Sequence, residues 1–304
     1  MKYSVGIDIG GTKIAIGIVT SSGELIDVVK LPTDKDKTPQ VIMKNIVVDT
    51  KKLLEINNIQ EHQLEGIGIG SPGPIHKEAG LIACPPNLQN WRNVDIVGYF
   101  KNHFTVDIYL ENDASAATLG EKWVGAAQEN QHFLFLTIST GIGAGIYTNG
   151  QLVRGTYGNA GDVGHIVIDP SRGKCVCGQK GCFEWVASGT AIARMASELL
   201  EKPLNTKEVF ALYEQKNESI VGLVEQVFEY IGMGLVTLIN TLEPEKIVIG
   251  GGVSQVGEPL FTFVQNYVKQ YALSPFGRDT EIVSAGLNQE AGIVGAAALC
   301  FLAD

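Results

Sequence analysis

The sequence lacks any cluster of basic residues, although it contains 23 lysines and arginines. Acidic residues number 33, which gives a formal net charge of -10 and an isoelectric point of 5.1. Proteins that bind nucleic acid usually present a basic stripe to the phosphate backbone. The charge pattern therefore argues against a nucleic-acid partner.

Long apolar runs are also missing. The longest apolar helix that we expect, around residues 231–242, is too short and too polar to cross a bilayer. Asp8 interrupts the first apolar stretch, which is typical of a buried strand rather than a signal peptide. We expect a cytoplasmic protein without a membrane partner.

Cysteine and histidine are scarce, with five of each in 304 residues, yet four of the ten fall between His165 and Cys182. Disulfides are rare in the cytoplasm, so this cluster favours metal binding or catalysis. Three cysteines and one histidine form a closed tetrahedral set for Zn²⁺. Free thiols, or a strained Cys175–Cys177 disulfide, are the alternatives to a structural zinc. The expected ligands are His165, Cys175, Cys177 and Cys182, and Cys84 and Cys300 are expected in the core.

The rest of the composition is that of a soluble globular protein, with 45% apolar residues and 36 glycines. Strands are expected at residues 3–9, 13–20, 24–31, 64–70, 107–111, 132–140, 144–148, 151–153, 246–252 and 280–285. Helices are expected at residues 38–57, 114–124, 188–200, 206–215, 219–242, 257–271 and from about 290.

Residues 13–26 and 141–153 align with one gap, which indicates an internal repeat and two domains. We expect an N-terminal α/β domain over residues 1–115, with the closing helix at about 290–304 packed back on it. The C-terminal α/β domain, over residues 116–289, carries the zinc loop.

Three glycine-rich turns follow apolar strands, at Asp8–Lys13, Ser139–Gly145 and Gly250–Ser254. Glycine lets backbone N–H groups approach phosphate oxygens closely. Hydroxyl donors come from Thr12, Thr140 and Ser254. A single turn of this kind only connects strands, whereas three together favour a bound nucleotide. The stretch Gly68–Gly73 matches a dinucleotide pattern, but Pro72 and Pro74 break the required helix, so we expect a loop.

Asn112 and Asp113 stand where a strand gives way to a helix. Asp113 fits a helix N-cap, or a general base for a substrate hydroxyl with Asn112 orienting a neighbouring one. Asp162 and Glu184 flank the zinc cluster. A bound zinc would fix the directions of both carboxylates, which could then bind the hydroxyl groups of a polyhydroxyl ligand. Solvated acids beside a structural zinc are the alternative.

Five segments in order resemble the ROK family (repressors, open reading frames, sugar kinases). They are "GIDIGGTK", "ENDASAA", "TISTGIGAG", "GHIVIDPSRGKCVCGQKGCFEWVASG" and "IVIGGG". The resemblance implies an actin-like, ribonuclease H-like ATPase fold with two α/β domains and a sugar in the cleft. It also implies ATP-dependent phosphorylation of a hexose at its 6-hydroxyl, most often glucose, in a homodimer or homotetramer.

The resemblance also implies residue roles. Asp113 would be the catalytic base, and Asp8 would act near Mg²⁺ and the γ-phosphate. ATP would contact Gly10, Gly11, Thr12, Lys13, Ser139, Thr140, Gly141, Gly143, Gly250, Gly251 and Gly252. The sugar would contact Gly73, Asn87, Asn112, Asp113, Asp162, His165 and Glu184.

One position departs from the family pattern. Asp162 stands in "GDVGH", where many glucokinases of the family have glutamate. In the family the acid at this position contacts the sugar near C1 and C2, so mannose, fructose, N-acetylmannosamine, N-acetylglucosamine or a β-glucoside remain alternatives to glucose. A sugar-sensing regulator without catalysis is a further alternative. Repressors of the family carry an added N-terminal helix-turn-helix, for which we expect no room before Tyr3.

Overall fold

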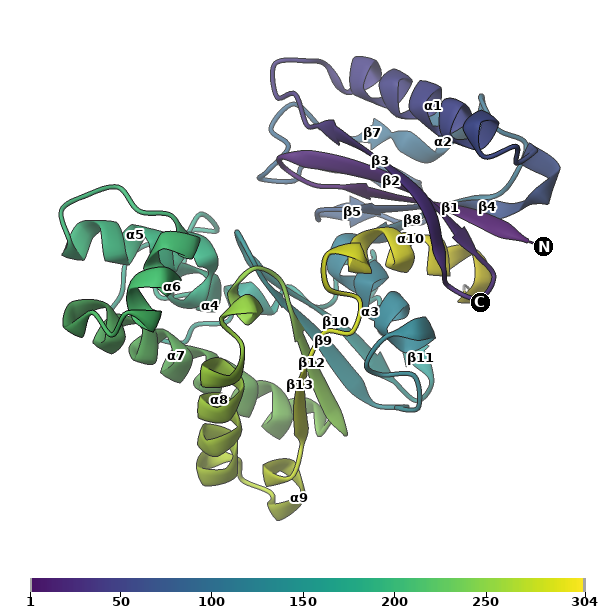
Figure 1. The fold of residues 1–304 in the computed structure, drawn as a ribbon. Helices are drawn as coiled ribbons and strands as arrows, with labels where there is room; N and C mark the ends of the chain where they lie inside the picture. Colours follow the sequence, from purple (N-terminus) through teal and green to yellow (C-terminus); the bar gives the residue numbers. More distant parts are fainter. Residues whose placement is uncertain (1, 303–304) are drawn as a thin grey trace. The chain divides into compact units, whose positions relative to one another are not determined.

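The computed structural model describes residues 2–302, which form two compact units (Figure 1). Unit 1 contains the chain up to Glu129, the segment Leu152–Gly161 and the chain from Gly286 onward. Unit 2 contains Asn130–Gln151 and Asp162–Ala285. The division differs from the expected boundary at residues 115 and 116, because the helix after residue 112 packs within unit 1.

Unit 1 is built on a five-stranded sheet of order β3-β2-β1-β4-β8. The strands are β1 (Tyr3–Ile9), β2 (Lys13–Thr20), β3 (Leu25–Pro32), β4 (Leu64–Ser71) and β8 (Ile108–Asn112). The first three are joined by antiparallel hairpins, whereas β4 and β8 run parallel to β1. The carboxyl ends of β1, β4 and β8 therefore lie at one edge of the sheet.

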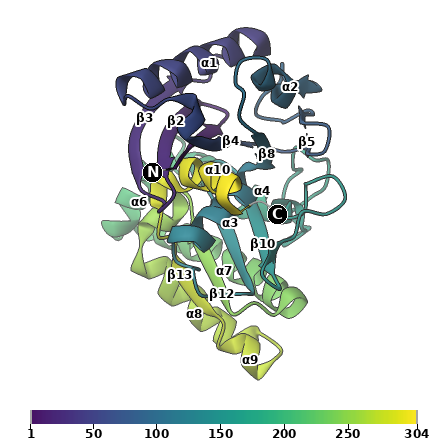
Figure 2. The ribbon, with the colours of Figure 1, turned by 90° about the vertical axis from the view of Figure 1, so that its right-hand side faces the viewer.

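Three long helices cover this sheet (Figure 2). They are α1 (Pro39–Ile56), α3 (Asp113–Val124) and α10 (Ala291–Leu302). Glycines in the strands explain how close α10 lies, because a Cβ at Gly6 would be 2.0 Å from the Ile293 carbonyl oxygen. A Cβ at Gly68 would be 1.8 Å from the Ala296 carbonyl oxygen. The strand expected at residues 64–70 is confirmed as β4, and only Pro72 and Gly73 of the stretch Gly68–Gly73 follow it as a loop.

Sequence patterns do not indicate a second, small sheet in unit 1. It consists of β5 (Ile75–His76), β6 (Leu81–Ile82) and β7 (Val94–Asp95). The short helix α2 (Ile96–Lys101) follows it, with the Asp95 carboxylate accepting a hydrogen bond from the Gly98 N–H. Glu61–Gln63 and Asn288–Glu290 form 3₁₀ turns. Two-residue strands are too short to show a period, which explains why they were missed.

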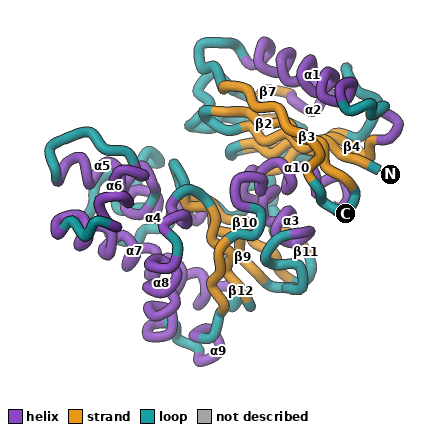
Figure 3. The backbone as a smooth tube through the Cα atoms, viewed as in Figure 1, coloured by secondary structure: helices purple, strands orange, loops and turns teal. Residues whose placement is uncertain are grey.

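Unit 2 repeats the strand order of unit 1, as β11-β10-β9-β12-β13 (Figure 3). Its strands are β9 (Phe133–Ile138), β10 (Ile142–Thr148), β11 (Gln151–Leu152), β12 (Lys246–Gly250) and β13 (Glu281–Ser284). Its helices are α4 (Phe183–Ala187), α5 (Gly189–Leu199), α6 (Thr206–Glu214), α7 (Glu218–Leu242), α8 (Glu258–Tyr271) and α9 (Pro275–Arg278), with 3₁₀ turns at Val163–His165 and Val253–Val256. The repeat detected in the sequence thus corresponds to two sheets of one topology.

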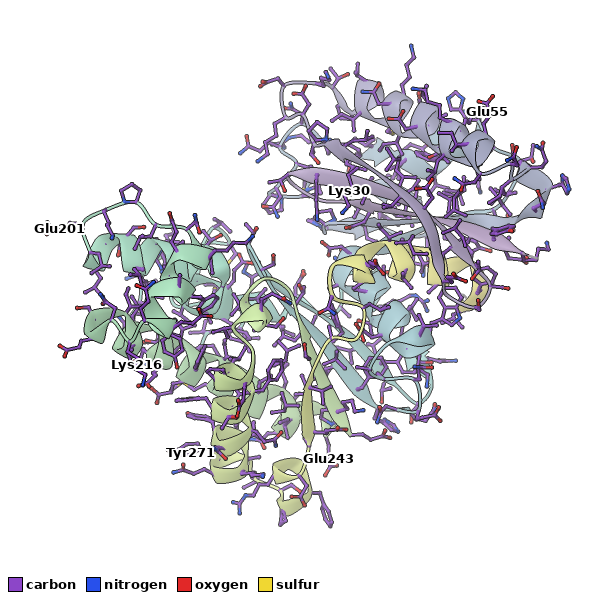
Figure 4. The ribbon with its side chains drawn as sticks, viewed as in Figure 1. Lys30, Glu55, Glu201, Lys216, Glu243 and Tyr271 are labelled. Atoms are coloured by element: carbon purple, nitrogen blue, oxygen red, sulfur yellow. The ribbon has the colours of Figure 1, made fainter. Side chains whose placement is uncertain are left out.

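Helix α7 is the core helix of unit 2, with Val224, Phe228 and Ile231 buried. Its length and composition would also allow it to cross a membrane, a test that buried helices of soluble proteins pass as well. It ends at Leu242, and the next residue, Glu243, is labelled in Figure 4. Glu243 adopts a left-handed φ of 45°. The burial of one full face identifies α7 as a packing element.

Candidate functional site

The first glycine turn in unit 1 is a tight hairpin between β1 and β2. The Gly10 N–H donates to the Lys13 carbonyl over 2.9 Å. The Thr33 hydroxyl donates to the Gly10 carbonyl over 2.7 Å, and the Thr33 N–H donates to the Thr12 carbonyl over 3.0 Å. These bonds fix the shape of the turn from a neighbouring segment.

Two acids, Asp8 and Asp113, lie near the carboxyl ends of the parallel strands β1 and β8. Asp8 is in β1, and Asp113 directly follows β8 as the first residue of α3. Burial and the negative charge of Asp113 raise the pKa of Asp8 to about 6, while Lys13 opposes the shift. Asp8 also lies against α10, because a Cβ at Gly292 would be 2.5 Å from its Cγ. Paired acids with a perturbed pKa are typical of functional sites.

The helix N-cap at this edge is Asn112. Its Oδ1 accepts hydrogen bonds from the N–H groups of Ala114, at 3.0 Å, and Ser115, at 3.2 Å. The N-cap interpretation of Asp113 is therefore wrong, since Asp113 is already inside the helix. Its Oδ1 accepts from the N–H of Ala114 over 2.8 Å.

Gly73 and Asn87, the other sugar-side candidates of unit 1, lie on loops at the same edge. A Cβ at Gly73 would be 3.2 Å from Asn112 Nδ2 and 3.4 Å from Asn159 Oδ1. A Cβ at Gly11 would be 3.0 Å from the Asn87 Cβ, so Asn87 borders the first glycine turn. Unit 1 thus brings its sugar-side and nucleotide-side candidates to one end of its sheet.

Glu184 stabilises the second glycine turn, which lies between β9 and β10 in unit 2. Glu184 Oε2 accepts a hydrogen bond from the Ile142 N–H over 2.9 Å. A Cβ at Gly141 would lie 2.3 Å from the same oxygen. The Ser139 carbonyl accepts from the Gly189 N–H over 2.7 Å, and the Thr140 carbonyl from the Thr190 hydroxyl over 2.8 Å.

The third glycine turn follows β12, and its three glycines differ. Gly251 has φ of +87°, and a Cβ there would be 2.4 Å from the Ile138 carbonyl oxygen. Gly252 has no neighbour within 4 Å of its Cβ position. The Ser254 hydroxyl donates to the Gly251 carbonyl over 2.8 Å, so its expected role as a donor to phosphate is not supported. Gly251 is required by the backbone, whereas Gly252 is open.

The cysteine cluster forms as expected. The ligand atoms of His165, Cys175, Cys177 and Cys182 all lie within 4.8 Å of one another. Cys177 Sγ is 3.5 Å from Cys182 Sγ, and Cys175 Sγ is 3.7 Å from His165 Nδ1. A Zn–S bond of about 2.3 Å in a tetrahedron places ligand atoms about 3.8 Å apart, so the four residues fit zinc.

All five cysteines are free of disulfides. Cys300 is buried as expected, but the expectation for Cys84 is wrong, because Cys84 is exposed on the loop after β6. Pro85 and Pro86 follow Cys84, and connecting loops of this kind run over the surface.

The zinc loop is fixed to the core of unit 2 through Asp169. Its carboxylate accepts hydrogen bonds from the Tyr230 hydroxyl on α7, at 2.9 Å, and from Arg172 Nε, at 3.2 Å. Cys182 then precedes the first residue of α4, which places Glu184 in the first turn of that helix. The metal loop therefore positions Glu184. Asp162 is exposed just before the 3₁₀ turn that carries His165.

Sequence reasoning missed two buried acids, Glu121 and Glu111. The second, Glu111, lies at the candidate site. Its side chain is fully buried, and its Oε2 accepts from Lys77 Nζ at 2.8 Å and Arg154 Nε at 2.9 Å. It immediately precedes Asn112 and Asp113 in the chain. A charged residue inside an otherwise apolar strand was the available signal.

The sequence profile of the ROK family matches residues 4–301. The chain belongs to the ROK family. A glucokinase from Halalkalibacterium halodurans is 35% identical, over 97% of this chain and 93% of that protein. The xylose repressor of Bacillus subtilis is 30% identical, over 96% of this chain and 75% of that protein.

Among solved structures, a ROK family glucokinase from Streptomyces griseus in complex with glucose and AMPPNP is similar. It is 28% identical, with a TM-score of 0.83, and each chain is covered to 98%. The actin-like, ribonuclease H-like fold expected from the ROK resemblance is confirmed. The two sheets of equal strand order are the two α/β halves of that ROK fold.

Proposed function

We propose that this ROK protein transfers the γ-phosphoryl group of ATP to the 6-hydroxyl of a hexose, with glucose as the first candidate. The observation that carries the proposal is the electrostatic coupling of Asp113 to Asp8, which lies in β1 just before the glycine turn that contains Gly10. A base for a hydroxyl and an acid suited to a metal-bound nucleotide are what such a reaction requires. The relatives named glucokinase support the same reaction.

In the proposed mechanism Asp113 accepts the proton of the 6-hydroxyl while that oxygen attacks the γ-phosphorus. The new O–P bond forms as the bond to the β-phosphate oxygen breaks, and ADP leaves. Asn112 holds the start of α3 and presents its amide beside Gly73. Positioning of this kind supplies most of the rate in phosphoryl transfer.

ATP would bind through the glycine turns, with Mg²⁺ on the nucleotide near Asp8. When bound, Mg²⁺ neutralises charge on the phosphate oxygens. The N–H groups of Gly11 and Thr12, in the turn shaped by Thr33, would face the phosphates. In unit 2, Glu184 keeps the turn at Gly141 in a fixed shape by accepting from Ile142.

Zinc would be held by the four ligands of the cysteine cluster and would be structural, because no ligand position is left for water. His165 uses Nδ1 toward the cluster, which leaves Nε2 for a sugar hydroxyl. Asp162 and Glu184 would add carboxylate contacts to the sugar. A cytoplasmic homodimer or homotetramer without a nucleic-acid or membrane partner completes the proposal.

A panel of sugars with Mg-ATP tests this function. ADP release would be measured for glucose, mannose, fructose, N-acetylmannosamine, N-acetylglucosamine and a β-glucoside, and kcat/KM compared. We expect glucose to rank first and phosphorus NMR to place the product phosphate on O6. Absence of ADP release with every sugar would contradict the proposal, and a different leading sugar would correct the substrate. Polyphosphate in place of ATP tests the donor.

The match to the xylose repressor favours a second candidate, a sugar-responsive regulator of transcription. The net charge of -10 and the Asp8–Asp113 pair oppose it. A gel shift with random-sequence DNA at low salt separates the two. We expect no retarded band, whereas a sugar-sensitive band without ADP release would favour the regulator.

A further inference from the structure

Glu111 is a fully buried acid at the end of β8, immediately before the proposed sugar and base residues. Moving a carboxylate out of water is costly unless it is paired and hydrogen-bonded. A fully apolar residue would fill this strand position without that cost. The groups that bind the Glu111 carboxylate should therefore explain why an acid stands at this position.

The partners of Glu111 come from two distant segments. Lys77, just after β5, and Arg154, in the segment Leu152–Gly161, both donate to Oε2. The backbone N–H of Asn112 donates to Oε1 over 3.2 Å. One carboxylate thus joins the end of β8 to the loop after Gly73 and to residues 152–161.

Asn159 makes a second connection between the same segments. Its Oδ1 accepts from the Ile75 N–H at 2.8 Å, and its Nδ2 donates to the Ile75 carbonyl at 2.9 Å. Its Oδ1 also lies 3.4 Å from the Cβ position of Gly73, opposite Asn112 Nδ2. Segment 152–161 is therefore held against the loop after Gly73 by Asn159 and, through Glu111, by Arg154. The Lys77 N–H also donates to the Tyr157 carbonyl over 3.4 Å.

None of these contacts involves the nucleotide side of unit 1. The turn at Gly10–Lys13 is shaped by Thr33, and Asp8 lies against Gly292. Loss of the Glu111 contacts should therefore loosen the sugar-side loop and leave the nucleotide turn intact. This separation makes the role of Glu111 measurable.

We propose that Glu111, through Lys77 and Arg154, is a positioning residue that fixes the Gly73 loop and Asn112 for sugar binding. The proposal rests on the proposed sugar-kinase function. It assigns Glu111 no contact with substrate. Loss of the Glu111 contacts should lower the affinity for sugar. Without them, sugar binding would have to order the Gly73 loop and the end of β8, which costs binding free energy.

The test measures steady-state kinetics and sugar affinity, by calorimetry without ATP, for Arg154→Ala and Lys77→Ala. The sugar is glucose, or the panel sugar with the highest kcat/KM. We expect each variant to raise the sugar KM and Kd at least tenfold, about 1.4 kcal/mol. The KM for ATP should change less than twofold. Arg154→Lys, which keeps a cation, should recover part of the affinity.

A double-mutant cycle shows whether Arg154 acts through Glu111. Glu111→Gln keeps the size and an acceptor for Asn112 but removes the charge. In that background we expect Arg154→Ala to change the sugar KM less than twofold, because the paired charge is already gone. Independent, multiplicative effects of the two substitutions would overturn the proposal.

Lys2→Ala is the matched control, since Lys2 also pairs with a glutamate, Glu65, but at the surface. It should leave all constants unchanged, and thermal unfolding should show that every variant is folded. Folded Arg154→Ala and Lys77→Ala variants with a normal sugar KM, or with sugar and ATP KM raised equally, would overturn the positioning role. A wild-type protein that turns over no sugar would instead overturn the proposed function.

Discussion

The carboxylate of Glu184 accepts a hydrogen bond from the backbone N–H of Ile142 over 2.9 Å. The helix that starts after the last cysteine of the zinc loop thus supports the second glycine turn. This relation explains why an acid follows Cys182 by two positions, because that spacing places it in the first turn of α4. The zinc loop and the second glycine turn are thus structurally coupled through Glu184.

Zinc removal should therefore affect more than the sugar side. We predict that chelation, or Cys182→Ser, lowers the unfolding temperature and raises the KM for both sugar and ATP. Glu184→Ala should reproduce the increase in the ATP KM while zinc content stays at about one per chain. Metal analysis with kinetics checks this. A Glu184→Ala variant with a normal ATP KM would show that the zinc loop does not affect ATP binding through the glycine turn.

The raised pKa of Asp8 predicts that its ionised form destabilises the folded protein. Unfolded Asp8 releases its proton near pH 3.8, but folded Asp8 holds it to about pH 6. Stability is therefore lost as pH rises through this window, by about 1–3 kcal/mol. We predict that Asp8→Asn is more stable than the wild type above pH 6, similar near pH 4, and inactive. Denaturant unfolding of the ligand-free protein at several pH values checks this prediction. A difference in the free energy of unfolding between Asp8→Asn and the wild type that is the same at all pH values would contradict it.

Gly292 leaves room for the Asp8 carboxylate. A Cβ there would be 2.5 Å from Asp8 Cγ, so Gly292→Ala must displace the carboxylate. We predict at least a tenfold lower kcat/KM for Mg-ATP, with the protein still folded, because a short side chain can shift. Gly222→Ala is the control, since Gly222 in α7 has no neighbour within 4 Å of its Cβ position. That control should be stabilised by about 0.5–1 kcal/mol, with unchanged kinetics.

The two glycines after β12 should respond differently to alanine. Gly251→Ala combines a φ of +87° with a Cβ 2.4 Å from the Ile138 carbonyl oxygen. We predict a loss of at least about 2 kcal/mol in the free energy of unfolding. Gly252→Ala has room and should leave stability unchanged while raising the ATP KM, if a nucleotide lies there. Equal stabilities for the two variants would show that the turn relaxes around Gly251.

Much of the fold could be predicted because its main strands and helices are long and periodic. β1 and β2 read clearly as strands, and the repeat around the Asn149–Gly150 turn indicated two equal halves. Helix α4 has only five residues, and the metal loop determines where it starts. Its pattern is too short to show a helical period.

The candidate site was predictable where its residues are close in sequence, as in the zinc loop and at Asn112–Asp113. The Glu111 contacts were not predictable, because Lys77 and Arg154 are 34 and 43 residues away in the chain. Two details of bonding within single turns were not predicted either. Ser254 binds its own turn, and Asn112 takes the cap position that was considered for Asp113.

The central claim is that Asp113 removes the proton from the attacking hydroxyl, and the kcat of Asp113→Asn tests it most directly. Asp49→Asn, at a half-buried position in α1 where Asp49 pairs with Lys52, is the matched control and should retain the wild-type kcat. For Asp113→Asn we predict a kcat at least about a hundredfold lower, with sugar and ATP still bound. A kcat within a few fold of the wild type would contradict the account.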